Sequence, residues 1–250
     1  MRARSALAAL VGTPTALGAL AGYQGLRAVG REYLPEPDYA VEATIRGRGH
    51  PLRLAVLGDS TVAGIGSPGP ERSLATLVAQ RVADELGRAV EVTGYGASGA
   101  RTADMPGQAA RLAPGADGVL VVIGSNDATH ALPPWRMRRD TAVMLRSVSH
   151  AARAPVVLGG IPEFATVPAL PQPLRGVLGT YAAILRERQR AGAADADVPY
   201  VDIAAEASPR FLGRPETMSA DAFHPSGVGY GLWADALAPA VAAAARATRR

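Results

Sequence analysis

One serine, one histidine and one aspartate in this chain have the types and the spacing that nucleophilic catalysis needs. Ser60 ends a Gly-Asp-Ser run that follows a short apolar stretch, and Asp221 precedes His224 by three residues. A serine hydroxyl attacks a carbonyl only after a base removes its proton, and an imidazole oriented by a carboxylate can be that base. Of the four histidines, only His224 has an acid spaced to orient it. We therefore predict Ser60 as nucleophile, His224 as base and Asp221 as the acid that orients the base.

Two other segments supply hydrogen-bond donors that a reacting carbonyl oxygen would need. Gly99 ends a glycine-rich loop and can present a backbone N–H with no side chain in the way, while Asn126 can present its side-chain amide. Donors aimed at a developing oxyanion are worth about 3–4 kcal/mol each. Taken singly, Gly99 fits an ordinary turn and Asn126 an ordinary helix cap. Together with Ser60 they favour an oxyanion hole.

These residues need a scaffold that gathers them, and the hydrophobic pattern predicts a parallel sheet. Continuous or alternating apolar runs predict five strands, at 52–57, 89–93, 118–123, 155–158 and 199–203. Apolar faces at helical spacing predict helices at 74–86, 137–148 and 177–192, and a closing helix at 227–249 that Pro239 should kink or split. Strands that alternate with helices form a parallel sheet between two helical layers. Ligands bind such sheets at the carboxyl ends of the strands, which Ser60, Gly99 and Asn126 follow.

Through the motifs at Ser60, Gly99, Asn126 and 221–224, residues 52 to about 240 resemble the SGNH hydrolase superfamily, whose members are also known as GDSL esterases and lipases. The resemblance implies an α/β fold, a three-layer α/β/α sandwich with a central, mainly five-stranded parallel sheet of the flavodoxin-like type. It implies that Ser60, Asp221 and His224 are the catalytic residues. It also implies that the backbone N–H of Ser60 joins Gly99 and Asn126 in the oxyanion hole.

Two positions differ from the pattern of that superfamily. Thr61 stands where the eponymous motif has leucine, and Gly94 stands where the second block often has asparagine. Neither change removes a reacting group, although a glycine at position 94 loosens the loop that carries Gly99.

The expected function is that of a serine esterase or acylhydrolase, which cleaves carboxylic esters through an acyl-serine intermediate. Its substrate would be a small-molecule, lipid or carbohydrate ester, and we expect no cofactor and no metal. The acyl-chain and leaving-group preferences do not follow from the sequence. The proline-rich stretch 161–176, which contains Phe164, is expected to border the acyl pocket. His130 either lines the rim of the site or is a solvated or capping loop histidine.

Two other classes of protein fit parts of the chain. One is a non-catalytic ligand-binding module on a hydrolase scaffold, which the presence of every expected catalytic group disfavours. The other is a dinucleotide-binding protein, because Gly94 to Gly99 spell G-x-G-x-x-G after a strand. That fingerprint requires an acid at the end of the next strand, whereas Asp117 comes before that strand.

Composition narrows the remaining choices. A chain of 250 residues, 48% of them hydrophobic, can bury one good-sized core. The absence of cysteine excludes disulfides, thiolate metal sites and a cysteine nucleophile. All 26 basic residues are arginines scattered among 22 acidic residues, so we predict no nucleic-acid partner. The histidines other than His224 have no partner at metal-ligand spacing.

The N-terminal 50 residues differ from the rest in their pattern of apolar and charged residues. We therefore predict an N-terminal segment at 1–50 followed by a hydrolase domain at 51–250. Residues 6–21 form an apolar stretch flanked by arginines, with a small-residue cleavage site at 19–21. This pattern favours an exported or membrane-anchored protein, with membrane association through residues 6–21, and leaves a cytoplasmic protein as the alternative. A linker is expected near 35–38, or at a similar point up to His50.

Overall fold

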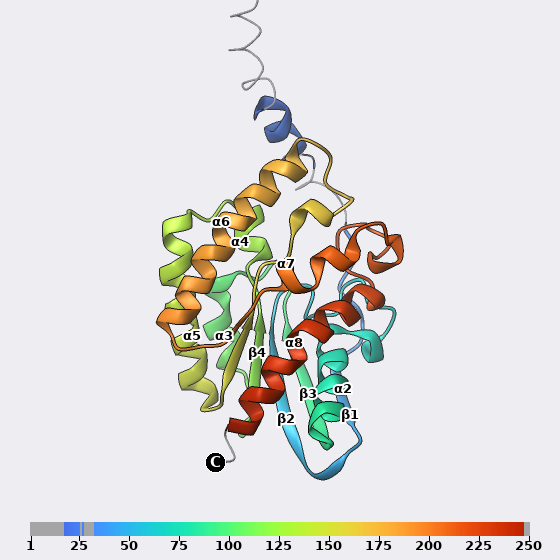
Figure 1. The fold of residues 1–250 in the computed structure, drawn as a ribbon, viewed down its shortest axis with the longest axis vertical. Coiled ribbons are helices and arrows are strands. Elements are labelled where there is room, and N and C mark those ends of the chain that lie inside the picture. Colours follow the sequence, from blue (N-terminus) through green and yellow to red (C-terminus); the bar gives the residue numbers. More distant parts are fainter. Residues whose placement is uncertain (1–17, 26, 28–32, 248–250) are drawn as a thin grey trace, which may run out of the picture.

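A single mixed sheet forms the centre of the computed structural model, which describes residues 18–25, 27 and 33–247 (Figure 1). The strands lie in the order β1-β3-β2-β4-β5-β6. Their bounds are β1 Glu42–Ile45, β2 Arg48–Gly58, β3 Arg88–Gly96, β4 Gly118–Val122, β5 Val156–Gly159 and β6 Tyr200–Val201. All pairs are parallel except β1 with β3. Apart from β1, the order is that of flavodoxin-like sheets, as predicted.

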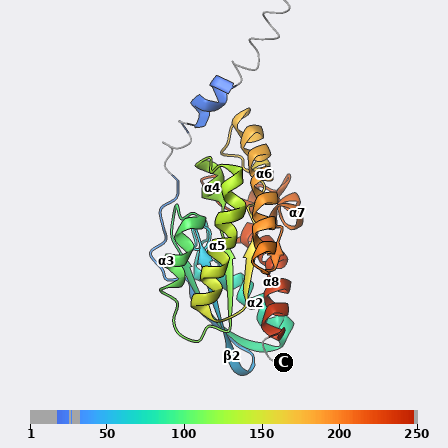
Figure 2. The same ribbon diagram turned by 90° about the vertical axis from the view of Figure 1, so that its left-hand side faces the viewer.

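Helices cover both faces of the sheet (Figures 1 and 2). The helices are α2 Leu74–Leu86, α3 Met105–Ala109, α4 Ser125–Thr129, α5 Pro134–Ala152, α6 Leu174–Asp195, α7 Ile203–Glu206 and α8 Gly227–Ala247. In β4, Leu120 and Val122 pack with α2 and α8, whereas Val119 and Val121 pack with α3 and α5. Because both faces are covered, this strand is apolar throughout, which is the pattern that predicted it.

The closing helix bears on one expectation. We predicted that Pro239 would kink or split it, and α8 is not split, because it continues as one helix through Pro239. Leu237, Ala238 and Val241 are buried, so packing holds together a helix that has lost one backbone hydrogen bond. Within the described residues, α8 alone is long and apolar enough to cross a membrane, and 56% of that stretch is buried inside the protein. This burial is what the core helix of a globular domain shows.

The N-terminal side of the sheet extends further than predicted. β1 pairs antiparallel with β3, with Glu42 opposite Thr93, so the sheet begins inside the expected linker. The predicted boundary after residue 50 falls within β2. β1 lies at the sheet edge and is half-exposed, so its four residues carry no continuous apolar run. Of the predicted membrane segment 6–21, residues 6–17 lie outside the described residues, and residues 18–25 are helical.

Candidate active site

The three predicted catalytic side chains lie in one chain of hydrogen bonds at the carboxyl edge of the sheet. His224 Nε2 lies 3.0 Å from Ser60 Oγ, although the two residues are 164 positions apart in the chain. On the other side of the ring, His224 Nδ1 lies 2.7 Å from Asp221 Oδ2. His224 and Asp221 are buried, and Ser60 is partly exposed. The hydroxyl of Ser60 is therefore the accessible end of this chain.

Asp221 is held as a fixed carboxylate. Its Oδ1 accepts hydrogen bonds from the Ser219 hydroxyl and from the backbone N–H groups of Phe223 and His224, at 2.8, 2.8 and 2.9 Å. Burial raises the pKa of Asp221, but the hydrogen bonds from His224 and its neighbours outweigh burial and hold this pKa well below its usual range. An ionised Asp221 keeps the proton of a neutral imidazole on Nδ1. Nε2 is then free to accept the proton of the Ser60 hydroxyl.

The turn that presents Ser60 is fixed from both sides. Asp59 is 2% exposed, and its Oδ1 accepts hydrogen bonds from the backbone N–H and the hydroxyl of Thr61, at 3.0 and 2.8 Å. Burial raises the pKa of Asp59, and the hydrogen bonds from Thr61 oppose this rise only in part. The threonine that replaces the leucine of the superfamily motif thus has a partner here, and it braces the residue before Ser60.

Two buried glutamines, which were not among the predicted site residues, hold the ends of three strands. Gln108 donates from Nε2 to Gly58 O and accepts at Oε1 from Gly58 N–H, at 2.8 and 3.0 Å. Gln189 likewise donates to Ile123 O and accepts from Ile161 N–H, at 2.8 and 3.1 Å. The end of β2, from which Ser60 projects, and the ends of β4 and β5 are therefore held by side-chain amides. The only local signal is a glutamine on an otherwise buried helix face.

Asn126 and Gly99 have different surroundings. Asn126 lines the same cavity as Ser60 and His224, and one N–H of its amide donates to Ala100 O at 2.9 Å. The second N–H of that amide remains for a ligand. Gly99 has a φ of +76°, is exposed, and lines a neighbouring depression. The structure thus places Gly99 one residue from the group that Asn126 contacts, but not among the residues that line the cavity.

Asp127 ties the loop that contains Gly99 to α4. Its Oδ2 accepts hydrogen bonds from the backbone N–H and the hydroxyl of Thr102, at 3.0 and 2.9 Å. Burial raises the pKa of Asp127, against these two hydrogen bonds. Because Asn126 and Asp127 are adjacent and both hold this loop, α4 and the loop form one unit.

A small cavity of about 60 Å³ lies beside Ser60. Its lining includes Ser60, Asn126 and His224, together with other polar side chains such as Glu163 and Ser208. The remaining wall is largely apolar and includes Pro162, Phe164, Val167, Phe211, Met218, Phe223 and Trp233. The cavity is small compared with the pockets of about 300–1,000 Å³ that hold drug-sized ligands. Phe164, from the 161–176 stretch, is one of the residues that line it.

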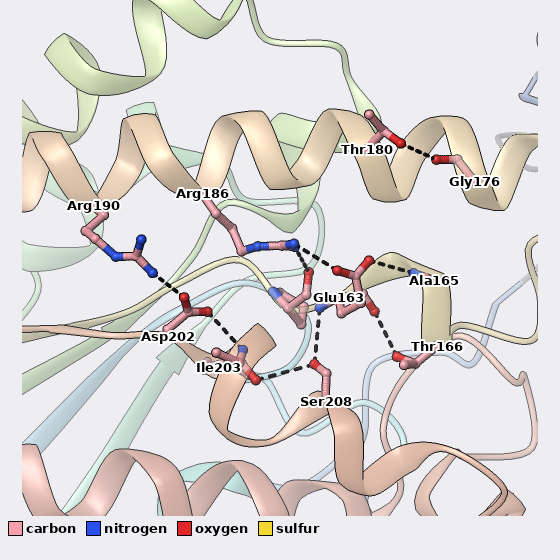
Figure 3. Close-up of polar contacts among 12 residues, drawn as sticks. Glu163, Ala165, Thr166, Gly176, Thr180, Arg186, Arg190, Asp202, Ile203 and Ser208 are labelled. Carbon is pink, nitrogen blue, oxygen red and sulfur yellow. Dashed lines mark hydrogen bonds and ion pairs between the residues drawn. The ribbon is translucent and has the colours of Figure 1, made fainter.

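A partly buried ion pair between Arg186 and Glu163 supports the cavity wall that contains Phe164 (Figure 3). Arg186 of α6 donates to Glu163 Oε2 at 2.8 Å and to Pro162 O at 3.1 Å. Glu163 N–H donates to Ser208 Oγ at 3.2 Å, and Ser208 Oγ donates to Ile203 O at 3.3 Å. The side chain of Arg186 is 11% exposed. This network fixes the loop after β5 between α6 and the helical turn at Ser208–Phe211.

His130 and the glycines of the G-x-G-x-x-G run have contacts that a structural role explains. His130 is exposed, its Nδ1 lies 2.8 Å from Asn126 O, and it is not among the residues that line the cavity, which fits a capping loop histidine. A Cβ at Gly96 would lie 2.0 Å from Ala63 N, and one at Gly94 would lie 2.9 Å from Val41 Cγ1. Close packing therefore accounts for both glycines without a dinucleotide. Across the described residues, no three His, Asp or Glu side chains gather closely enough to hold a metal ion.

The chain has identifiable relatives among known sequences. It matches the model of the GDSL-like Lipase/Acylhydrolase family over residues 56–232. It is also similar to a GDSL-like esterase of Mycobacterium tuberculosis, with 32% identity over 193 residues. The matched part is 74% of this chain and 60% of that relative, so the chain spans about 60% of the relative's length.

Solved structures of three bacterial enzymes share the fold, each at 22% identity. A phospholipase A1 from Streptomyces albidoflavus aligns with a TM-score of 0.59 over 78% of this chain and 100% of its own. An extracellular lipase from Streptomyces rimosus aligns at 0.56, over 77% and 99%. A lipase/acylhydrolase from Enterococcus faecalis aligns at 0.58, over 76% and 95%. These similarities confirm the predicted fold class.

Proposed function

We propose that this chain, which belongs to the GDSL-like lipase/acylhydrolase family, hydrolyses carboxylic esters through an acyl-serine intermediate. The observation that carries the proposal is the unbroken series of hydrogen bonds from Ser60 through His224 to Asp221. A base at hydrogen-bond distance from a hydroxyl, itself oriented by a carboxylate, is what activates a serine. The chemistry uses side chains and backbone groups alone.

In the acylation step, Ser60 Oγ attacks the ester carbonyl carbon while His224 Nε2 takes the hydroxyl proton. Asp221 stabilises the imidazolium that forms. The negative charge on the carbonyl oxygen is received by the second amide N–H of Asn126, with the backbone N–H groups of Gly99 and Ser60 as the other donors. Collapse of the tetrahedral intermediate breaks the bond to the alkoxy oxygen, which takes the proton from His224 and leaves as the alcohol.

Deacylation repeats these roles with water. His224 Nε2 removes a proton from a water molecule, whose oxygen attacks the acyl carbon bound to Ser60. The second intermediate collapses, Ser60 Oγ recovers its proton from His224, and the carboxylic acid is released. Each turnover thus consumes one ester and one water and yields one acid and one alcohol.

We further propose that the acyl chain occupies the cavity beside Ser60 and that it is short. A cavity of about 60 Å³ favours short acyl chains over long ones. The apolar wall gives such a chain a dry environment, whereas the alcohol would extend from the open side of Ser60. Lipids, sugar acetates and other esters with short acyl groups remain within this class.

The test is hydrolysis of p-nitrophenyl esters from acetate to decanoate, together with labelling by a fluorophosphonate. We expect turnover, labelling of the wild-type protein, and no labelling of Ser60→Ala. A protein that releases no p-nitrophenol and resists the label would instead be a ligand-binding module. Retained labelling in Ser60→Ala would show that another residue is the nucleophile.

Export or membrane anchoring through residues 6–21 is likewise a proposal. The extracellular lipase among the structural relatives is compatible with export. Fractionation of cells that express the full chain would show the protein in the medium, the membrane or the cytosol, and the last result would contradict the proposal.

A further inference from the structure

The segment 33–38, which includes the expected linker at 35–38, contacts two loops of the site. The backbone N–H of Leu34 donates to Asp221 Oδ2 at 3.3 Å. That oxygen is the one that His224 Nδ1 contacts. Two residues further on, Glu36 Oε1 accepts a hydrogen bond from Ser98 N–H at 2.8 Å, in the loop that contains Gly99. The same short segment therefore contacts both the loop at 221–224, which we call the acid–histidine loop, and the loop with Ser98 and Gly99, which we call the glycine loop.

Tyr33 adds a third contact, through its ring. Its centroid lies 4.6 Å from that of Phe223 and 6.1 Å from that of His224, and it meets the imidazole edge-on. Phe223 and His224 are themselves 5.2 Å apart and nearly perpendicular. Phe223 and His224 line the cavity, and Tyr33 does not. Tyr33 thus packs behind the two rings and limits how the imidazole can tilt.

The chain before this segment is also attached to the domain. Gln24 donates from Nε2 to Gln172 O at 2.8 Å, and its Oε1 accepts from Leu174 N–H at 3.1 Å. The helix that contains Gln24 lies beyond the N-terminal end of α6 in both ribbon views (Figures 1 and 2). The stretch between Phe164 and α6 is therefore fastened to the N-terminal region as well.

We propose that residues 33–36 are a positioning segment of the active site, which holds the acid–histidine pair and the glycine loop in their reactive arrangement. This inference rests on the proposed ester hydrolysis. The loop at 221–224 needs such support, because Ala222 has a φ of +56°, in the left-handed region that is costly for a residue with a Cβ. A carboxylate that accepts from a fixed backbone N–H as well as from the imidazole has less freedom to rotate away from the ring.

The first test uses single substitutions in the full chain. Tyr33→Ala should lower kcat about 2- to 10-fold, the fold-change that corresponds to the loss of one aromatic contact, and leave KM unchanged. Tyr33→Phe keeps the ring and should restore kcat. Asp38→Asn, an exposed position in the same segment, is the matched control and should behave as wild type. Wild-type kcat in Tyr33→Ala, or an equal loss in Asp38→Asn, would overturn the proposal.

The second test does not depend on turnover. The proton shared by His224 Nδ1 and Asp221 Oδ2 should give a far-downfield proton NMR signal, which His224→Ala would assign by its loss. We expect Tyr33→Ala and Leu34→Pro, which removes the donor N–H, to shift this signal or speed its exchange, and Asp38→Asn to leave it unchanged. An unshifted signal in both variants would overturn the positioning role. If wild type shows the signal but hydrolyses no ester, the proposed function fails and the positioning role is judged by the NMR arm alone.

Discussion

Phe164 should limit the length of the acyl chain, and its removal should extend the range of substrates. The ring is 3% exposed and borders the cavity beside Ser60. Phe164→Ala removes six ring carbons from that wall. A buried methylene contributes about 0.8 kcal/mol, or roughly fourfold in kcat/KM. Two further methylenes that fit the enlarged space should therefore raise the ratio of kcat/KM for octanoate over butyrate at least tenfold, even if part of the space collapses.

The assay is a series of p-nitrophenyl esters from acetate to decanoate, read as kcat/KM. Loss of a buried phenyl ring costs about 3–5 kcal/mol of stability, so melting temperatures must be measured alongside. Leu170→Ala is the matched control, because Leu170 is buried in the same apolar cluster but does not line the cavity. The reasoning fails if the chain-length profile of Phe164→Ala equals that of wild type, or if Leu170→Ala changes the profile as much.

Four other substitutions test separate parts of the site. Ser60→Ala should abolish ester turnover while circular dichroism and melting temperature stay near wild type; turnover near wild type would refute its assignment. Asn126→Ala should lower kcat roughly 10²–10³-fold with a small effect on KM, whereas a purely structural Asn126 would show up as lost stability instead. Arg186→Met leaves the partly exposed Glu163 without its charge partner and should lower the free energy of unfolding in urea by about 1–3 kcal/mol; an unchanged free energy of unfolding would contradict this role of the pair. Burial raises the pKa of Asp59 in the folded state, so ionising this carboxyl lowers the stability of the fold as pH rises above the ordinary carboxyl range. Asp59→Asn should therefore raise the melting temperature at pH 7 and have no such effect near pH 4. A difference in melting temperature that is the same at both pH values would contradict this prediction.

The parallel sheet and the long helices could be predicted because each produces a local pattern of apolar residues in the sequence. The central parts of the parallel strands are buried, so their apolar runs are continuous or regularly alternating. The helix α2 ends at Gly87, which is in the left-handed conformation. β1 escaped prediction because it is a half-exposed edge strand of four residues. Its existence depends on the pairing of Glu42–Ile45 with β3 and not on its own composition.

The site residues that were predicted stand in local motifs, whereas those that were missed act through contacts with distant parts of the chain. Ser60, Asn126, Asp221 and His224 stand in short runs whose chemistry can be read residue by residue. Gln108 and Gln189 bind backbone groups 28 to 66 positions away, and such contacts leave no trace in the neighbouring sequence. Proline residues around Glu36 are typical of a linker, yet the glutamate side chain reaches the loop at Ser98. Residues that position a site by binding distant backbone groups therefore cannot be identified from a single sequence.

The proposed positioning segment also constrains where an N-terminal leader could end. Cleavage at the predicted small-residue site, 19–21, would leave Gln24 and Tyr33 on the mature protein, and with them the contacts to Gln172 and Phe223. Cleavage or truncation at residue 40 would remove both, so loss of activity in such a truncation would not by itself report on export. A variant that lacks residues 1–21 should therefore keep its kcat, whereas one that lacks residues 1–40 should fall at least to the level of Tyr33→Ala. Equal kcat in the two truncated proteins would show that the N-terminal contacts serve attachment alone.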